Sequence, residues 1–250
     1  MTSAIRAYYG EIAAVAVPHV RARPFTMKRH YTSPRSPFVW EKDAPAEMPA
    51  WIPVCPQPAK SRGGALVRYP LVNSRRALLW MVDYGCIDLH VWLSRCDRPD
   101  RPDQALIDLD PKGGRFADVV RAALRVKEIL DAAGLESVVH TTGGDGMHVR
   151  IPLARVHTFE ETRAFGYGVG GLVGVPGVTV DAKMNGHGQQ IVAPWSVRPP
   201  DLAVATPLRW DEVDESLDPR TFTMDVALER AAEHGDLAAP LLGSRQRLPV

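Results

Sequence analysis

The chain has 250 residues, of which 45% are hydrophobic and 24% charged, and its formal net charge at pH 7 is +1. This composition is ordinary for a globular protein with one large domain or two small ones. No apolar run approaches the roughly 20 residues that a membrane-spanning helix needs, and the first twelve residues lack a secretory signal, so no contact with a membrane is expected. The three cysteines, Cys55, Cys86 and Cys96, predict no disulfide scaffold and indicate a reducing, intracellular location.

Charge is unevenly distributed along the chain. Residues 1–80 carry 12 Lys/Arg against 4 Asp/Glu, whereas residues 201–250 carry 5 against 10. A basic first third is suited to contact with a phosphate backbone, because such binding is largely electrostatic. A solvated basic face is the alternative explanation.

The first third predicts one helix followed by irregular structure. Ile5–Val17 is expected to form a helix that ends before Pro18, and the nine prolines between Pro18 and Pro58 favour loops and short strands. We divide the chain into an N-terminal basic subdomain (residues 1–80), a core (residues 81–235) and a loosely held C-terminal tail (residues 236–250).

The middle of the chain has clearer periodicity. Strands are expected at Ile87–Leu93 and Ala105–Leu109, followed by an amphipathic helix at Phe116–Ala133 with Gly134 as its left-handed cap. Further strands are expected at Ser137–Thr141, Met147–Pro152, Val178–Ala182 and Gln189–Ala193. This order predicts an α+β sandwich with a mixed or antiparallel sheet flanked by helices.

One strand ends in a pair of carboxylates. In ALIDLDPKGG, alternation places Asp108 and Asp110 on one face of the strand and Leu109 on the other. Carboxylates this close repel each other unless a cation lies between them, and their oxygens suit Mg²⁺ or Mn²⁺. A bare Asp-x-Asp is common, and the alternative is a surface strand end. Asp181 interrupts the apolar run GVTVDAKM, where it would either share the metal site or form an ion pair with Lys183 or a nearby arginine.

Other polar segments suggest phosphate binding. In HTTGGDGMH, the glycines at 143, 144 and 146 allow a tight turn whose amides can cradle phosphate oxygens, and His148 can donate to a phosphate. Asp88 and His90 are expected on the polar side of their strand. The spacing of Cys86, His90 and Cys96 offers too few ligands for zinc. The segment QQIVAPWSVRP supplies Gln190, Ser196 and Arg198, and Arg198 can clamp a triphosphate.

Taken in order, these motifs resemble the polymerase domain of bacterial DNA ligase D, a branch of the archaeo-eukaryotic primase superfamily. The resemblance extends from about Tyr8 to Phe222 and includes RPFTMKR, FVWEKDAP and IDLHVW. It assigns Asp108, Asp110 and Asp181 to catalysis and metal binding. Together with the segment QQIVAPWSVRP, it gives a set of candidate nucleotide-binding residues comprising His90, Thr142, Gly143, Gly144, His148, Gln190, Ser196 and Arg198. Lys28, Arg29 and Lys42 are the candidates for DNA contact, and Arg23 is expected to be structural.

The resemblance implies a primase-type core with an RRM-like sheet and an N-terminal subdomain. It implies template-directed addition of NTPs or dNTPs to a DNA 3′-hydroxyl, or primer synthesis, with two Mn²⁺ or Mg²⁺ ions as cofactors. The implied setting is DNA repair such as non-homologous end joining, in the cytoplasm at the nucleoid. The expected partners are gapped, broken-end or primer-template DNA, with a separate DNA ligase and end-binding protein. Ligase and nuclease domains of fused members are absent, so a stand-alone form is expected.

Several residues depart from the family pattern. Asp145 stands where the family usually has lysine, and a second basic residue after Arg198 is replaced by Pro199 and Pro200. The glycine-rich FGYGVGGLVGVPG replaces a longer helical stretch that ends in an arginine. Fewer cations near the triphosphate predict weaker nucleotide binding or a different substrate preference.

Two alternative functions remain open. The first is a nucleic-acid-binding module with this fold but little or no catalysis. Asp145 and the shortened glycine-rich segment favour it, whereas the presence of all three candidate metal aspartates favours activity. The second is a phosphohydrolase with Asp108 as nucleophile, but the threonine expected after Asp-x-Asp in such enzymes is absent, and the Ser-Val-Arg motif would be unexplained.

Overall fold

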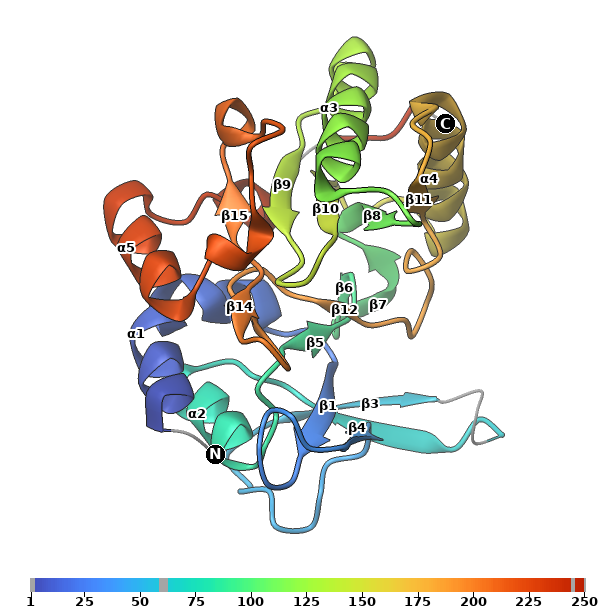
Figure 1. The fold of residues 1–250 in the computed structure, drawn as a ribbon. Coiled ribbons are helices and arrows are strands. Elements are labelled where there is room, and N and C mark those ends of the chain that lie inside the picture. The colour runs from blue at the N-terminus through green and yellow to red at the C-terminus, as the bar shows by residue number, and fades with distance from the viewer. Residues whose placement is uncertain (1–2, 59–62, 244–245, 250) are drawn as a thin grey trace.

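The computed structural model describes residues 3–58, 63–243 and 246–249. It consists of two antiparallel sheets, each with helices on one face (Figure 1). The helices are α1 (Ser3–Val20), α2 (Arg75–Asp83), α3 (Phe116–Ala132), α4 (Phe159–Val173) and α5 (Met224–His234), with short 3₁₀ helices at Trp210–Glu212, Pro219–Thr221 and Ala239–Leu242. The predicted α+β class is confirmed.

The larger sheet has five strands in the order β11-β8-β10-β9-β15. They are β11 (Val178–Asp181), β8 (Gln104–Pro111), β10 (Met147–Pro152), β9 (Val138–Thr141) and β15 (Pro207–Leu208). Residues Ala105, Ile107 and Leu109 of β8 are buried in one apolar cluster with the inner side of α3. Because strand residues alternate in direction, Asp108 and Asp110 lie on the opposite face.

The smaller sheet has four strands in the order β12-β5-β1-β2. They are β12 (Ile191–Val192), β5 (His90–Val91), β1 (Phe25–His30) and β2 (Phe38–Glu41). Phe25, Met27 and Leu89 pack with α1 and α2 in a second apolar cluster. This sheet joins strands from both sides of residue 80, because β1 pairs with β5. The division of the chain at residue 80 stays a prediction.

Three hairpins complete the strands: β3 (Val54–Pro58) with β4 (Leu66–Pro70), β6 (Ser94–Arg95) with β7 (Arg98–Pro102), and β13 (Val197–Arg198) with β14 (Ala203–Val204). The described residues include no helix that is long and apolar enough to cross a membrane.

Several predicted boundaries were wrong where packing outweighs local signals. Helix α1 continues past Pro18 because the following His19 and Val20 are buried in the core. The strands expected at Ile87–Leu93 and Gln189–Ala193 are only two residues each, β5 and β12. Helix α3 and the left-handed Gly134 (φ 70°) are as predicted.

Helix α4 was not predicted, because its glycines lower helix propensity. Thr158 and Glu161 nevertheless form a reciprocal capping box at its start, a sequence signal for this helix. Gly166 lets α4 approach the sheet, since a Cβ there would lie 2.7 Å from the Cβ of Ala182. The first part of the glycine-rich segment, up to Val173, therefore belongs to α4, which has 15 residues.

Two further expectations were wrong. Cys55 of β3 and Cys96 form a disulfide, because the fold brings the β3–β4 hairpin against the segment after β6. The chain after Gly235 is not loosely held over its described part. Asp236 lies 2.8 Å from the His19 ring and accepts a hydrogen bond from Trp195, and Leu241 and Leu248 are buried. Residues 244–245 and 250 lie outside the described residues.

Arg23 is a buried structural residue whose loss should destabilise the fold. Its guanidinium makes two hydrogen bonds to the Asp103 carboxylate, of 2.7 and 2.8 Å, and its exposed fraction is 1%. Arg23→Leu leaves Asp103 buried with only Arg95 as a charged partner, so we expect a loss of about 3 kcal/mol in the free energy of unfolding. Urea unfolding measures this loss. Arg125→Leu on the exposed side of α3 is the control and should change stability by less than about 1 kcal/mol.

Candidate active site

Polar residues form a row across the larger sheet. Asp181 of β11 lies opposite Asp108 of β8, which lies opposite His148 of β10, which lies opposite His140 of β9. All four therefore belong to the sheet face opposite α3. Strand register thus places Asp181, Asp108 and His148 at paired positions on neighbouring strands.

Asp108 and Asp110 are held as a mutually repelling pair. Burial raises the pKa of Asp108 to about 6, although the charges of Arg150 and Arg198 oppose the rise. Burial also raises the pKa of Asp110 to about 6, and the negative charges of Asp108, Asp145 and Asp181 add to the increase. A cation bound at this position would relieve both effects.

One oxygen of Asp108 suits a metal ion. Its Oδ1 atom is buried and accepts no hydrogen bond from the described residues. His148 Nε2 lies 3.1 Å from this oxygen, but the contact is too poorly aligned to count as a hydrogen bond. A buried carboxylate oxygen without a donor, next to a second carboxylate, is the donor chemistry that Mg²⁺ and Mn²⁺ prefer.

Asp181 is paired in register with Asp108, but its carboxylate accepts hydrogen bonds from other groups. It accepts a hydrogen bond of 2.6 Å from the backbone amide of Lys183 and one of 3.4 Å from the Tyr167 hydroxyl. Within residues 3–58, 63–243 and 246–249, no three histidine, cysteine, aspartate or glutamate side chains are grouped as a ready metal site.

The glycine-rich turn after β9 is shaped by its first residue. Thr142 Oγ1 accepts hydrogen bonds from the backbone amides of Gly144 and Gly146 and donates to the carbonyl of Gly146. Gly143 has φ 73°, and a Cβ there would lie 2.4 Å from Cγ of Arg198. Arg198 therefore packs directly against the turn, and its Nε has no hydrogen-bond partner in the described part of the chain.

His90 of the smaller sheet belongs to a row of three contacting side chains, His90, Asp88 and Lys28. Its Nε2 lies 3.1 Å from Asp88 Oδ2, which also receives a 2.7 Å hydrogen bond from Lys28 Nζ. Burial alone would raise the pKa of Asp88, but the hydrogen bond from His90 and the Lys28 charge lower it to about 2. Asp88 and His90 are buried, so the polar side that was expected for their strand faces the interior of the protein and not the solvent.

An aromatic patch of Phe38 and Trp40 beside His90 was not predicted as a site. Phe38 and Trp40 are each 45% exposed, and the Trp40 ring lies 5.0 Å from the His90 ring. Lys28 Nζ lies 4.4 Å from the centre of the Phe38 ring. The signal in the sequence is FVW on a strand opposite Lys28, which leaves two aromatic rings on one face. Exposed rings next to cations are typical of surfaces that stack bases.

The remaining predicted residues occupy less direct positions. Ser196 is fully buried, and its hydroxyl accepts from the Leu89 amide and donates to the Val197 carbonyl. Gln190 accepts from Thr26 at 3.2 Å. Arg29 donates to Tyr84 and lies 3.5 Å from Glu41, so its charge is partly compensated, whereas Lys42 is half-buried at the end of β2.

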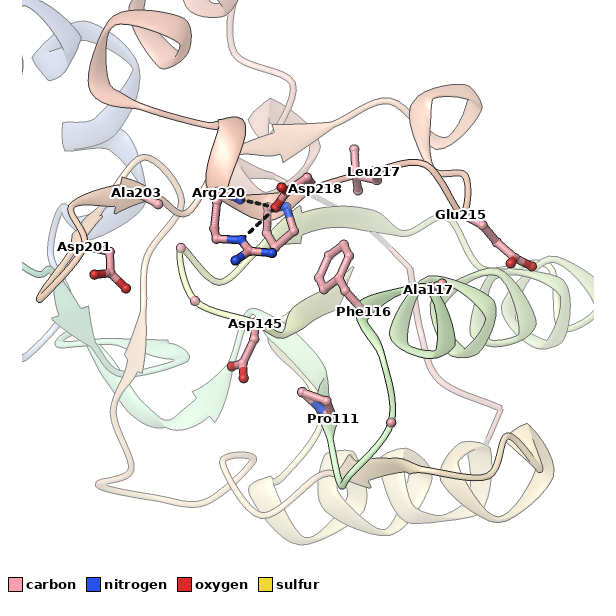
Figure 2. A pocket seen from close by; sticks show the side chains of 14 residues that line it. Pro111, Phe116, Ala117, Asp145, Asp201, Ala203, Glu215, Leu217, Asp218 and Arg220 are labelled. Carbon is pink, nitrogen blue, oxygen red and sulfur yellow. Dashed lines mark hydrogen bonds and ion pairs between the residues drawn. The ribbon is translucent and has the colours of Figure 1, made fainter.

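A cavity of about 710 Å³ borders the glycine-rich turn (Figure 2). Phe116, Leu217 and Pro219 form an apolar wall. The charged lining is mostly acidic and includes Asp145, Asp201, Glu215, Asp218 and Arg220. Arg220 is itself hydrogen-bonded to Asp218, as Figure 2 shows. A phosphate group would therefore meet net negative charge on this side of the turn.

The fold and site agree with a known family of proteins. The family model described as "LigD, primase-polymerase domain" matches residues 3–171 and 176–238. The chain therefore belongs to the LigD primase-polymerase domain family, as its motifs predicted.

Named relatives give the same result. The chain is 28% identical to the multifunctional non-homologous end joining protein LigD of Mycolicibacterium smegmatis, over 94% of this chain and 33% of that protein. It is 27% identical to the bifunctional LigD of Bacillus subtilis, over 91% of this chain and 39% of that protein. The chain thus spans between a third and two fifths of these relatives. The solved polymerase domain of Mycobacterium tuberculosis ligase D in complex with DNA shares the fold, with a TM-score of 0.87, 24% identity and coverage of 98% of this chain and 93% of that chain.

The raised pKa of Asp108 predicts how stability depends on pH without metal. The folded chain keeps this proton up to about pH 6, whereas the unfolded chain releases it near pH 4. Stability should therefore fall as the pH rises between these values. In EDTA, Asp108→Asn should raise the free energy of unfolding by about 1–2 kcal/mol near pH 7.5 and change it little near pH 4. Urea unfolding at several pH values tests this, and a gain that did not depend on pH would contradict it.

Proposed function

We propose that this protein catalyses template-directed nucleotidyl transfer to a DNA 3′-hydroxyl by a two-metal mechanism, in the repair of broken or gapped DNA. The observation that carries the proposal is the Asp108–Asp110 pair, with its unpartnered buried oxygen, beside a glycine-rich turn and Arg198. Membership of the LigD primase-polymerase domain family supports it.

Asp108 and Asp110 would hold the metal ions, with Asp181 as a further ligand once its carboxylate leaves the Lys183 amide. Bound Mn²⁺ or Mg²⁺ would lower the pKa of the attacking 3′-hydroxyl and stabilise the charge on the leaving pyrophosphate. The metal-free carboxylates repel each other, so they offer a strong electrostatic gain to ion binding.

The residues around the pair would bind the incoming nucleotide. Amides of the turn from Thr142 to Gly146 and the Arg198 guanidinium would contact the triphosphate. His148 Nε2, already directed at the metal side of the sheet, would donate a hydrogen bond there. Gln190, bonded to Thr26, would contact the nucleotide beside His90. Ser196 would act indirectly, by holding the backbone of Leu89 through its hydrogen bond. The aromatic patch next to His90 would stack a base.

DNA would lie along the basic first third of the chain. Lys28, Arg29 and Lys42 are the candidate contacts, and the partial compensation of Lys28 and Arg29 by Asp88 and Glu41 means that these side chains would exchange partners on binding. The related M. tuberculosis domain is in complex with DNA, and the named relatives are end-joining proteins. A separate DNA ligase and an end-binding protein would be the partners in such a repair step. The protein would act at the nucleoid in the cytoplasm.

A nucleic-acid-binding module with little turnover is the second candidate. The negative charge of Asp145 lies close enough to Asp110 to raise its pKa, and the lining of the adjoining cavity is mostly acidic. Both features would weaken triphosphate binding.

Primer extension distinguishes the two candidates. Wild type should extend a primer on gapped DNA with NTPs or dNTPs only when Mn²⁺ or Mg²⁺ is present, and Asp108→Ala/Asp110→Ala should reduce the rate at least about 1,000-fold because no metal site remains. DNA affinity should be unchanged in the double variant, as measured by fluorescence anisotropy. Tight DNA binding by wild type without extension would support the binding module instead.

Asp145→Lys tests the effect of the acidic turn. Reversing this charge removes repulsion from Asp110 and adds a cation beside the turn, so the KM for the nucleotide should fall about three- to tenfold. Glu160→Lys, at the exposed start of α4, is the matched control with the same change in charge and should leave KM unchanged. An unchanged or higher KM for Asp145→Lys would argue against phosphate binding at this turn.

A further inference from the structure

Arg150 is a buried cation directly behind the candidate active site. It follows His148 by two residues on β10, so both side chains lie on the polar face of the larger sheet. Its exposed fraction is 2%. No motif of the sequence pointed to it, and burying a guanidinium is costly unless its donors are all used.

The guanidinium makes three hydrogen bonds to groups on three different strands. Its Nε donates to His140 Nε2 on β9 at 2.9 Å, and Nη1 donates to Gln104 Oε1 on β8 at 2.9 Å. Its Nη2 donates to the backbone carbonyl of Val192 on β12, which belongs to the smaller sheet. All three acceptors are neutral, so none of them directly compensates the charge.

The first bond fixes the state of a buried histidine. Because Arg150 Nε donates, His140 Nε2 must be the acceptor, and the ring proton is on Nδ1. That atom lies 2.8 Å from the Thr141 carbonyl, which accepts a hydrogen bond from the Nδ1–H group. Both nitrogens are therefore engaged, and the His140 ring cannot turn without losing a hydrogen bond.

The fixed ring supports His148. The two rings lie 4.8 Å apart at an angle of 84°, edge to face. His148 Nδ1 has no hydrogen-bond partner in the described residues, so contact with His140 is a main constraint on the orientation of His148 toward Asp108.

The third bond reaches the other half of the site. Val192 is the register partner of His90 across β12 and β5. A single guanidinium on the larger sheet therefore holds the strand that pairs with His90, and so fixes the distance between His90 and His148.

We propose that Arg150 is a positioning residue that sets the orientation of His148 and its spacing from His90 for nucleotide binding. This inference rests on the proposed function for its catalytic consequence, but not for its structural content. A side chain that only filled the core would need no donors, whereas this one connects both histidines that face the substrate.

The experiment compares Arg150→Met, Arg150→Lys and His140→Phe with wild type, and uses Arg125→Met on the exposed side of α3 as the control. Arg150→Met keeps most of the volume but removes every donor, and Arg150→Lys can keep only part of the three bonds. Extension rates are measured per folded molecule, with folding checked by circular dichroism. Arg150→Met and His140→Phe should lower kcat/KM for the nucleotide about 10- to 100-fold, Arg150→Lys should be intermediate, and DNA affinity should not change.

A second readout does not require activity. Histidine side-chain ¹⁵N spectra of wild type should show His140 protonated at Nδ1 only, with its signals assigned by their loss in His140→Phe. In Arg150→Met the His140 Nε2 signal should shift because that nitrogen loses its hydrogen-bond donor, while the Thr141 carbonyl keeps the proton on Nδ1, and the His148 and His90 signals should shift as well. Arg125→Met should leave them in place.

The outcomes separate the two proposals. Wild-type kcat/KM in folded Arg150→Met, or His140 protonated at Nε2 in wild type, overturns the positioning role. If wild type shows no extension but the histidine signals behave as expected, the proposed function fails and the positioning of the two histidines stands.

Discussion

The candidate site depends on two partly buried carboxylates that one strand holds close together. Asp108 and Asp110 are on one strand, with the leucine between them buried against α3, so the pair cannot separate without loss of core packing. Asp145 and Asp181 add to the negative charge, and Arg150 and Arg198 reduce it. The result is a concentration of acidic side chains, held in place by the same apolar contacts that stabilise the sheet.

Each sheet has one apolar face and one polar face, and the candidate residues His90 and Asp108 lie on the two polar faces. In each sheet the apolar face packs on helices, α1 and α2 for the smaller and α3 for the larger. The opposite faces carry His90 and His148, and the charge of His90 contributes to lowering the pKa of His148, after burial and the charges of Arg150 and Arg198. Direct bonds between the halves, such as the one from Arg150 to Val192, make the relative placement of the sheets part of the site.

Local patterns in the sequence predicted the features that depend on neighbours in the chain. Alternation in β8 placed the aspartates, helical periodicity gave α3, and the glycines of the turn allowed its left-handed Gly143. Features that depend on distant segments were not predictable in this way. The disulfide, the bond between Lys28 and Asp88 and the burial of Arg150 each require knowledge of which strands pair. Helix α4 was missed because a tertiary need for Gly166 beside Ala182 conceals the local helix signal.

The pairing of His90 with Val192 also governs when the site can form during folding. These residues are separated by roughly a hundred positions, so β12 closes the smaller sheet only after a long loop has been ordered. The pairs β10 with β8 and β10 with β9 are much more local and can form earlier. During synthesis on the ribosome, the carboxylate half would therefore be organised while the His90 half is still open. In a nascent chain, the strands that carry Asp108 and Asp110 would thus pair before β12 pairs with the strand of His90.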